Sequence, residues 1–237
     1  MKIHQKNTMP ESNAQSSWDK LVEKSEYHFD NNCMDPRWDT VQLLGQLDAT
    51  NWKSDVDDII ARSQPANWET RGFKGNGVEV PQSELVDEEY DLERAGIDPK
   101  VIITNLDWTL SPQFQEISDR FGLQDCMNRI HVQMPGQLWH RHIDKLYKWF
   151  PSDPSRVMRI FIALTDWQPG QFWEYGNYHH RGWPAGEVHT FDWQNVPHST
   201  ANAGFHPRVT LQLTGIATEK TEQFLTQLEQ TTIYKII

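Results

Sequence analysis

The spacing of hydrophobic and polar residues changes along the chain. After residue 125 the period is two: apolar and polar side chains alternate over 130–134, and the turn-forming pair Pro135-Gly136 follows. Further strands are expected over 157–165 and 208–216. In the last of these strands one face is polar and the other apolar. A polar stripe on a strand needs solvent or a ligand, so this face is a candidate part of a functional site.

Before residue 125 the spacing is mixed and mainly helical. Three apolar residues recur at helical spacing, namely Val41, Leu44 and Leu47. Ser54, with Asp57 three positions later, resembles a capping box and predicts a short helix through Ile60. Ser111-Pro112 predicts the start of a second helix, which Gly122 ends.

These patterns divide the chain into four parts. Residues 1–38 form a polar arm that we expect to be partly disordered, and 39–125 form a helical or mixed region that packs on the core. Residues 126–217 form a β core, and 218–237 a C-terminal helix. Within the second part we expect a loop over 68–81, an acidic surface helix over 84–94 and a buried strand over 101–103.

Composition narrows the class of protein. The 237 residues carry a net charge of -11, which argues against nucleic acid as the main partner because phosphate contacts require clustered Lys and Arg. The sequence contains no apolar run long enough to span a membrane and does not open on a signal peptide. Cys33 and Cys126 are the two cysteines. A reduced, cytoplasmic protein is therefore expected.

The most informative motif is His142-Ile143-Asp144, followed by His198 and then by Arg208. Two imidazoles and one carboxylate can occupy one face of a metal ion and leave the opposite face open for further ligands. The first pair suits a strand, where residues i and i+2 project to the same side. The arginine can hold a dicarboxylic ligand through a bidentate ion pair.

This constellation resembles the Fe(II)/2-oxoglutarate-dependent oxygenases, whose core is a double-stranded β-helix, a jelly-roll or cupin-like barrel. The segments 159–164, 183–188 and 197–208 are similar to the aspartyl/asparaginyl β-hydroxylase group, which includes free proline hydroxylases. The resemblance covers roughly residues 128–216. One departure is Phe161, which stands where that group often has a histidine.

The resemblance implies a mainly β fold with flanking helices, and an enzyme that uses Fe(II), 2-oxoglutarate and O₂. His142, Asp144 and His198 would hold the iron. Arg208 and Thr210 would bind the far carboxylate of 2-oxoglutarate, and Arg159 is a further cofactor-binding candidate. The reaction would hydroxylate an unactivated C–H bond, with release of succinate and CO₂.

Other histidines compete for these roles. His189 competes with His198, because Pro184-x-Gly186-x-x-His189 resembles a cupin motif, but His198 is followed by the arginine and a strand. His140 is expected at the mouth of the pocket. The pair His179-His180 is expected on the surface or in a substrate loop rather than as metal ligands, and His131 at the edge of the core.

The substrate class and rival functions stay open. A locally basic segment surrounds the metal motif, with Arg141, Lys145, Lys148, Arg156 and Arg159. It suggests a carboxylated substrate, such as an amino acid, a peptide side chain or another small metabolite, held by Arg141, Lys145 or Arg159. The rivals are a cupin-type dioxygenase or isomerase without 2-oxoglutarate, and a non-catalytic ligand-binding barrel. The oligomeric state is left open.

Overall fold

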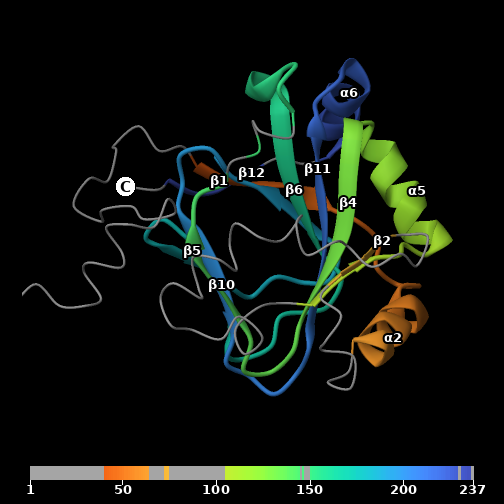
Figure 1. Ribbon diagram of the computed structural model, residues 1–237, viewed down its shortest axis with the longest axis vertical. Helices are drawn as coiled ribbons and strands as arrows, with labels where there is room; N and C mark the ends of the chain where they lie inside the picture. The colour runs from red at the N-terminus through yellow and green to blue at the C-terminus, as the bar shows by residue number, and fades with distance from the viewer. Residues whose placement is uncertain are drawn as a thin grey trace, which may run out of the picture.

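The computed structural model describes residues 40–63, 72–74, 105–144, 146, 150–228 and 231–235. The larger sheet contains β1 (Thr40–Gln46), β2 (Gly72–Lys74), β3 (Asn105–Trp108), β4 (Gln124–Gln133), β6 (Val157–Ala163), β9 (Glu187–Thr190), β11 (Arg208–Ile216) and β12 (Thr231–Lys235). Their order across the sheet is β12-β1-β9-β6-β11-β4-β3-β2 (Figure 1).

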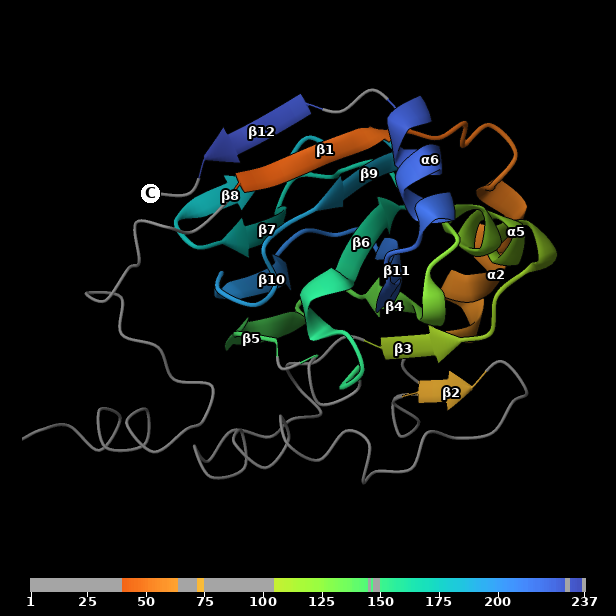
Figure 2. The same cartoon turned by 90° about the horizontal axis from the view of Figure 1, so that it is seen from above.

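The smaller sheet contains β5 (Leu138–His142), β7 (Gln171–Tyr175), β8 (Tyr178–His180) and β10 (His198–Asn202), in the order β5-β10-β7-β8. From β4 to β11 the chain passes repeatedly from one sheet to the other. Figure 2 shows the smaller sheet lying against the larger one. This alternation is the double-stranded β-helix, so the predicted fold class is confirmed.

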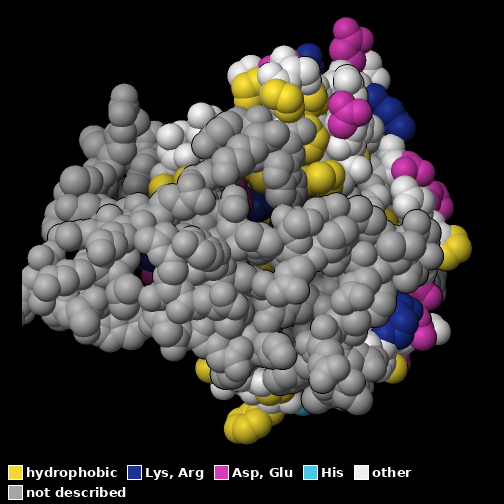
Figure 3. Space-filling model, in the orientation of Figure 1, with side chains coloured by type: hydrophobic (Ala, Val, Ile, Leu, Met, Phe, Trp, Pro, Cys, Tyr) yellow, Lys and Arg dark blue, Asp and Glu magenta, His cyan; other side chains and the backbone are white. Residues whose placement is uncertain are grey.

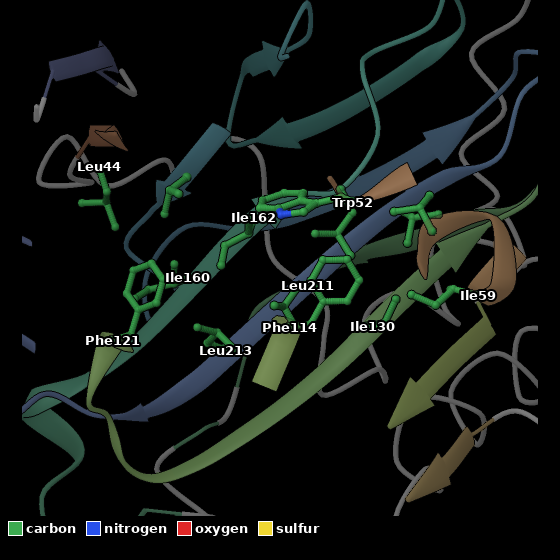
Figure 4. Packing of buried hydrophobic residues seen from close by; sticks show 14 of the residues in the cluster. Leu44, Trp52, Ile59, Phe114, Phe121, Ile130, Ile160, Ile162, Leu211 and Leu213 are labelled. Atoms are coloured by element: carbon green, nitrogen blue, oxygen red, sulfur yellow. The ribbon is translucent and has the colours of Figure 1, made fainter. Parts of the chain in front are cut away.

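Two hydrophobic cores lie on opposite faces of the larger sheet. The outer core is formed with α2 (Lys53–Arg62), α5 (Pro112–Phe121) and α6 (Glu219–Gln227). Figure 4 shows Phe114 and Phe121 of α5 packed toward Leu211 and Leu213 of β11. The inner core lies between the sheets and is mainly aromatic, with Phe161, Trp173, Tyr175, Trp183, Phe191 and Trp193.

Strand β11 shows how the two faces differ. Val209, Leu211 and Leu213 are fully buried in the outer core. The intervening residues, Arg208, Thr210, Gln212 and Thr214, are buried as well and face the space between the sheets. The polar stripe expected from the sequence therefore lines the barrel interior rather than the surface.

The helix expected from Val41, Leu44 and Leu47 was wrong, because residues 40–46 form β1. Strand β1 is buried on both faces: Val41 packs in the inner core, and Leu44 packs in the outer one. Register shifts flank these positions in the pairing with β12 and β9. A strand buried on both sides thus places apolar residues three apart, which imitates helical spacing.

The helices match the remaining expectations in part. Helix α5 begins after the N-cap Ser111, whose side chain accepts a hydrogen bond from the Phe114 backbone, and it ends at Gly122 with left-handed φ of 62°. Helix α2 begins at Lys53 after Trp52, so the capping box at Ser54 was wrong.

The C-terminal part is also not one helix. Helix α6 ends at Gln227, after which Thr231–Lys235 add β12 to the edge of the larger sheet. The N-terminus of α6 is capped by a reciprocal pair of hydrogen bonds between Thr218 and Thr221. A helix over the whole of 218–237 was therefore wrong.

The expectations for 1–38, 68–71, 75–81, 84–94 and 101–103 lie outside the described residues, as does Cys33. Cys126 is half-buried and has a free thiol. Within the described residues, every helix is too short or too polar to cross a membrane. Figure 3 shows acidic and basic side chains interspersed along the right edge of that view.

Among the glycines that the structure describes, Gly186 should tolerate alanine least. Its φ is +90°, and an added Cβ would lie 2.1 Å from the Leu47 carbonyl oxygen. That carbonyl belongs to a segment tied to Gly186 by a 2.9 Å backbone hydrogen bond. The control is Gly182, which has φ of +81° and open space around its Cβ position.

Both substitutions to alanine share the left-handed backbone cost of about 1–2 kcal/mol. Gly186→Ala should lower the free energy of unfolding by roughly 2 kcal/mol more than Gly182→Ala, since only Gly186 meets backbone atoms. Urea denaturation measures both. Equal losses would contradict the close approach.

Candidate metal centre

Strand pairing brings the two histidines of the motif together. Strands β5 and β10 are antiparallel neighbours in which His142 lies directly opposite His198. Their ring centroids are 4.3 Å apart. Asp144 follows β5 by two residues, and all three side chains are buried. The predicted triad is therefore assembled in space, although 56 positions separate its histidines.

The distances within the triad suit a shared metal ion. His142 Nε2 lies 3.6 Å from Asp144 Oδ1, and His198 Nε2 lies 3.5 Å from Asp144 Oδ2. These separations are too long for strong hydrogen bonds. Two ligands bonded to one metal at about 2.0–2.2 Å stand roughly 3.0–3.5 Å apart. The donor set and its spacing therefore fit a divalent transition metal.

The protonation states suit metal binding too. Burial, with the neighbouring His142, lowers the pKa of His198 to about 3, so its imidazole is neutral at physiological pH. Burial alone would raise the pKa of Asp144, but Arg159 and the two imidazoles outweigh it and hold that pKa well below its usual range. Neutral imidazoles and an ionised carboxylate are the forms that ligate metals.

Arg159 is the counter-ion of Asp144. Its Nη1 donates to Asp144 Oδ2, and both side chains are almost fully buried. Its Nε also donates to Thr214 Oγ1 at 3.3 Å. Arg159 thus lies directly beside the three candidate metal ligands.

Arg208 is buried with part of its guanidinium unsatisfied. The side chain is 1% exposed, and its Nε and Nη2 atoms have no hydrogen-bond partner among the described residues. Its Nη1 donates to the Phe172 carbonyl at 3.2 Å and to Thr200 Oγ1. The guanidinium carbon lies 4.4 Å from the ring centroid of Trp173. Burial lowers the pKa of Arg208 to about 9, which leaves it charged at neutral pH.

A pocket lies beside the triad and Arg159. It is lined by the triad together with Arg129, His131, Trp139, Arg159, Phe161, Trp173, Ser199, Thr200 and Gln212. Trp173 and Thr200 contact Arg208 from the same wall. Trp139 also lines the pocket, and its buried Nε1 has no hydrogen-bond partner in the described ranges. Arg208 is not one of the lining residues, but it lies directly behind two of them, Trp173 and Thr200.

The other predicted residues have mixed outcomes. Thr210 is buried on the inner face of β11, and its role stays a prediction. The basic segment is not a free cationic surface: Arg141 forms an ion pair with Glu174 at 2.8 Å, and Arg156 one with Glu222 at 3.1 Å. Lys145, Lys148 and the His140 side chain lie outside the described part of the chain.

Two of the expectations for histidines were wrong. The pair His179-His180 is not a surface pair, because His180 is buried while the side chain of His179 is 58% exposed. His131 is not a simple core-edge residue, because it lines the pocket. With its amide oriented to satisfy its neighbours, Gln212 donates to His131 Nε2 at 3.0 Å and accepts from Arg159 Nη2 at 3.2 Å.

Sequence reasoning missed Thr200 and Trp173 as partners of Arg208. Both lie in the smaller sheet, on β10 and β7, whereas Arg208 opens β11 in the larger sheet. Their contacts cross the barrel interior, which no local spacing encodes. Their positions two residues from His198 and Tyr175 on inward-facing sides of strands were the available signal.

No protein-family model and no curated protein matches the sequence. Among solved structures, a prolyl-4-hydroxylase from Pseudomonas putida is 18% identical over 75% of this chain and 93% of its own, with a TM-score of 0.48. A viral collagen prolyl hydroxylase from Paramecium Bursaria Chlorella virus-1, in complex with 2OG, is 9% identical over 49% of this chain and 81% of its own, with a TM-score of 0.36.

A Cupin 2 conserved barrel domain protein from Salinispora arenicola is 15% identical over 44% of this chain and 74% of its own, with a TM-score of 0.29. Similarities at these identities and TM-scores say nothing about the chemistry of the site. That chemistry has to be inferred from the geometry of the site itself.

Arg159→Met should destabilise the metal-free protein strongly, because it leaves Asp144 as a buried charge without its partner. The expected loss in the free energy of unfolding is about 3–5 kcal/mol in EDTA. A bound divalent metal would replace the guanidinium as counter-ion, so the loss should be smaller in the metal-loaded protein. Urea denaturation with and without metal measures both.

Arg156→Met is the matched control. Its pair with Glu222 is solvent-exposed, so the change should stay within about 1 kcal/mol. Equal losses for Arg159→Met with and without metal would show that Asp144 is not a ligand.

Proposed function

We propose that this chain is an Fe(II)- and 2-oxoglutarate-dependent dioxygenase that hydroxylates an unactivated C–H bond of a small carboxylated substrate. The observation that carries the proposal is that two features adjoin one pocket, the first as part of its lining and the second directly behind the lining residues Trp173 and Thr200. One is the His142–Asp144–His198 triad with ligand spacing, and the other is Arg208, a buried cation with two unsatisfied nitrogens. An enzyme that uses a metal ion together with a dicarboxylic cosubstrate would need both features: the triad for the metal and the arginine for the cosubstrate.

The triad would hold the iron by one face. Three protein ligands leave the remaining coordination positions for the keto acid and O₂. When bound, the iron and 2-oxoglutarate would supply the oxidising chemistry, with succinate and CO₂ as coproducts. Asp144 also argues against halogenation, because an intact carboxylate ligand takes the position that chloride would need.

Arg208 would bind the far carboxylate of 2-oxoglutarate. Its Nε and Nη2 lie on one edge of the guanidinium, which is the edge that meets a carboxylate in a bidentate pair. Trp173 covers the guanidinium face, and Thr200 and the Phe172 carbonyl hold Nη1. These contacts fix the orientation of the unsatisfied edge before the anion arrives. Thr210, on the same face of β11, would add a hydroxyl.

Arg159 would serve the other end of the cosubstrate or the substrate. Because it already contacts Asp144, its guanidinium lies beside the metal, where an anion bound to the metal would meet it. The neighbouring wall carries Arg129 and the Trp139 donor. This concentration of cationic and donor groups favours a carboxylated substrate, and it replaces the earlier expectation that Arg141 recognises it, since Arg141 is paired with Glu174.

Variants of the triad test the metal assignment. Asp144→Ala, His142→Ala and His198→Ala should each lose the iron bound at the triad and abolish succinate formation, because each removes one of three protein ligands. Metal content after anaerobic loading and turnover-coupled succinate release measure the two effects. The exposed His179→Ala should keep both. Full iron content and turnover in all three triad variants would overturn the assignment.

Variants of Arg208 test the cosubstrate. Arg208→Met should raise the KM for 2-oxoglutarate more than roughly tenfold, because truncating one partner of a desolvated charge pair costs about 2–5 kcal/mol. The KM for the primary substrate should change far less. Arg208→Lys should recover part of the loss, since a point charge cannot reproduce the fork.

Stability separates this role from a structural one. Removing an unpaired buried charge offsets the lost contacts, so Arg208→Met should change the unfolding free energy of the ligand-free protein by less than about 2 kcal/mol. Unchanged dependence on 2-oxoglutarate in both variants would instead favour a cupin-type enzyme that does not use it.

A further inference from the structure

A second cluster of metal-ligating side chains lies inside the same barrel. It consists of His180 on β8 and of Glu187 and His189 on β9, all buried. Strand β8 belongs to the smaller sheet and β9 to the larger one, so the cluster joins the two sheets. One ligand atom from each residue lies within 4.8 Å of the others.

One nitrogen from each histidine lies near the same carboxylate oxygen of Glu187. His180 Nε2 lies 2.6 Å from Glu187 Oε1, and His189 Nδ1 lies 3.7 Å from the same oxygen. The second distance is too long for a hydrogen bond. Within the part of the chain that the structure describes, His189 Nδ1 accordingly has no hydrogen-bond partner, although the residue is buried. A buried polar atom without a partner calls for an explanation, and a cation held between the imidazole and the carboxylate is one that also accounts for the third ligand, His180.

The other nitrogen of His189 is already engaged. Its Nε2 lies 2.7 Å from the Tyr175 hydroxyl. A partner on one ring nitrogen fixes the orientation of a ligating imidazole and leaves the other nitrogen for the metal. The Tyr175 hydroxyl is therefore the partner that orients His189 toward Glu187 and His180.

This cluster is separate from the triad. None of its residues lines the pocket that holds His142, Asp144 and His198. Tyr175 lies between the two groups: its hydroxyl contacts His189, and its ring stacks on His198 at a centroid distance of 6.4 Å. Trp183 covers His180 with a centroid distance of 5.5 Å. The triad opens to a pocket, whereas this cluster is enclosed by aromatic side chains.

We propose that His180, Glu187 and His189 form a second, structural metal site that takes a divalent cation such as Zn²⁺. Two imidazoles and one carboxylate are ligands that Zn²⁺ uses, with bonds of about 2.0–2.2 Å. Ligand atoms would then stand roughly 3.0–3.5 Å apart, so small side-chain shifts complete the site. The metal would fasten β8 to β9 and thereby one sheet to the other.

The site is tested in the full-length protein without the triad. A His142→Ala/His198→Ala variant, stripped of metal, is titrated with Zn²⁺ against a chromophoric chelator. We expect about one tight equivalent to remain, against about two in the unmodified protein. Zinc should also raise the melting temperature of this variant, because a ligand that binds only the folded state stabilises it.

Adding Glu187→Gln or His189→Gln to that variant should remove the remaining equivalent and the zinc-dependent rise in melting temperature. Glu187→Gln keeps the side-chain volume and an oxygen that can accept the hydrogen bond from His180. This variant should therefore fold normally, which circular dichroism checks. Adding His179→Gln should change nothing, since that neighbouring side chain is exposed.

Three outcomes would overturn the proposal. The variant without the triad could bind no zinc, it could keep its zinc after Glu187→Gln and His189→Gln, or zinc could leave its melting temperature unchanged. The first would mean that a proton rather than a metal joins His180 to Glu187. Succinate formation is not measured in this experiment, so its result does not depend on the proposed catalytic function.

Discussion

Charge buried without a matching counter-ion is the constraint on which the rest of this structure depends. Arg208 lies in the barrel interior with two nitrogens unsatisfied by the described residues, whereas the buried Asp144 is paired with Arg159. Removing an ion from water costs several kcal/mol even after relaxation. The fold tolerates this because the same strands bury apolar side chains on their other face. Leu211 and Leu213, neighbours of Arg208 on β11, are each worth about 1.5–3 kcal/mol when fully buried.

The double-layered arrangement thus separates stability from chemistry. Helices α2, α5 and α6 cover the outer face of the larger sheet and complete a core that contains no charged residue of the site. The inner face is then available for polar groups, and strand register decides which of them meet. The direct pairing of His142 with His198 and the crossing contact between Arg208 and Thr200 are consequences of register. Neither depends on a flexible loop, which favours a preorganised site.

Features with a local cause could be predicted from the sequence. The alternation along β11, the N-cap Ser111 and the His-x-Asp spacing each depend on residues a few positions apart, and the structure has all three. Features that depend on what packs on a segment could not. Strand β1 imitated a helix because both of its faces are buried, and His180 looked like a turn residue because its partners lie on another strand. Thr200 was missed for the same reason.

In the sequence, His189 and His198 are alternative candidates for the same metal-ligand position, and in the structure each belongs to its own candidate metal site. Both side chains point into the barrel, and each belongs to a group of two histidines and one carboxylate on opposite sides of Tyr175. Solvent access distinguishes them. The His198 group lines a pocket that also contains cationic and donor side chains, whereas the His189 group is closed by Trp183 and its own strands. Catalytic metals need an open coordination position and structural ones do not, so the two groups suit different roles in one barrel.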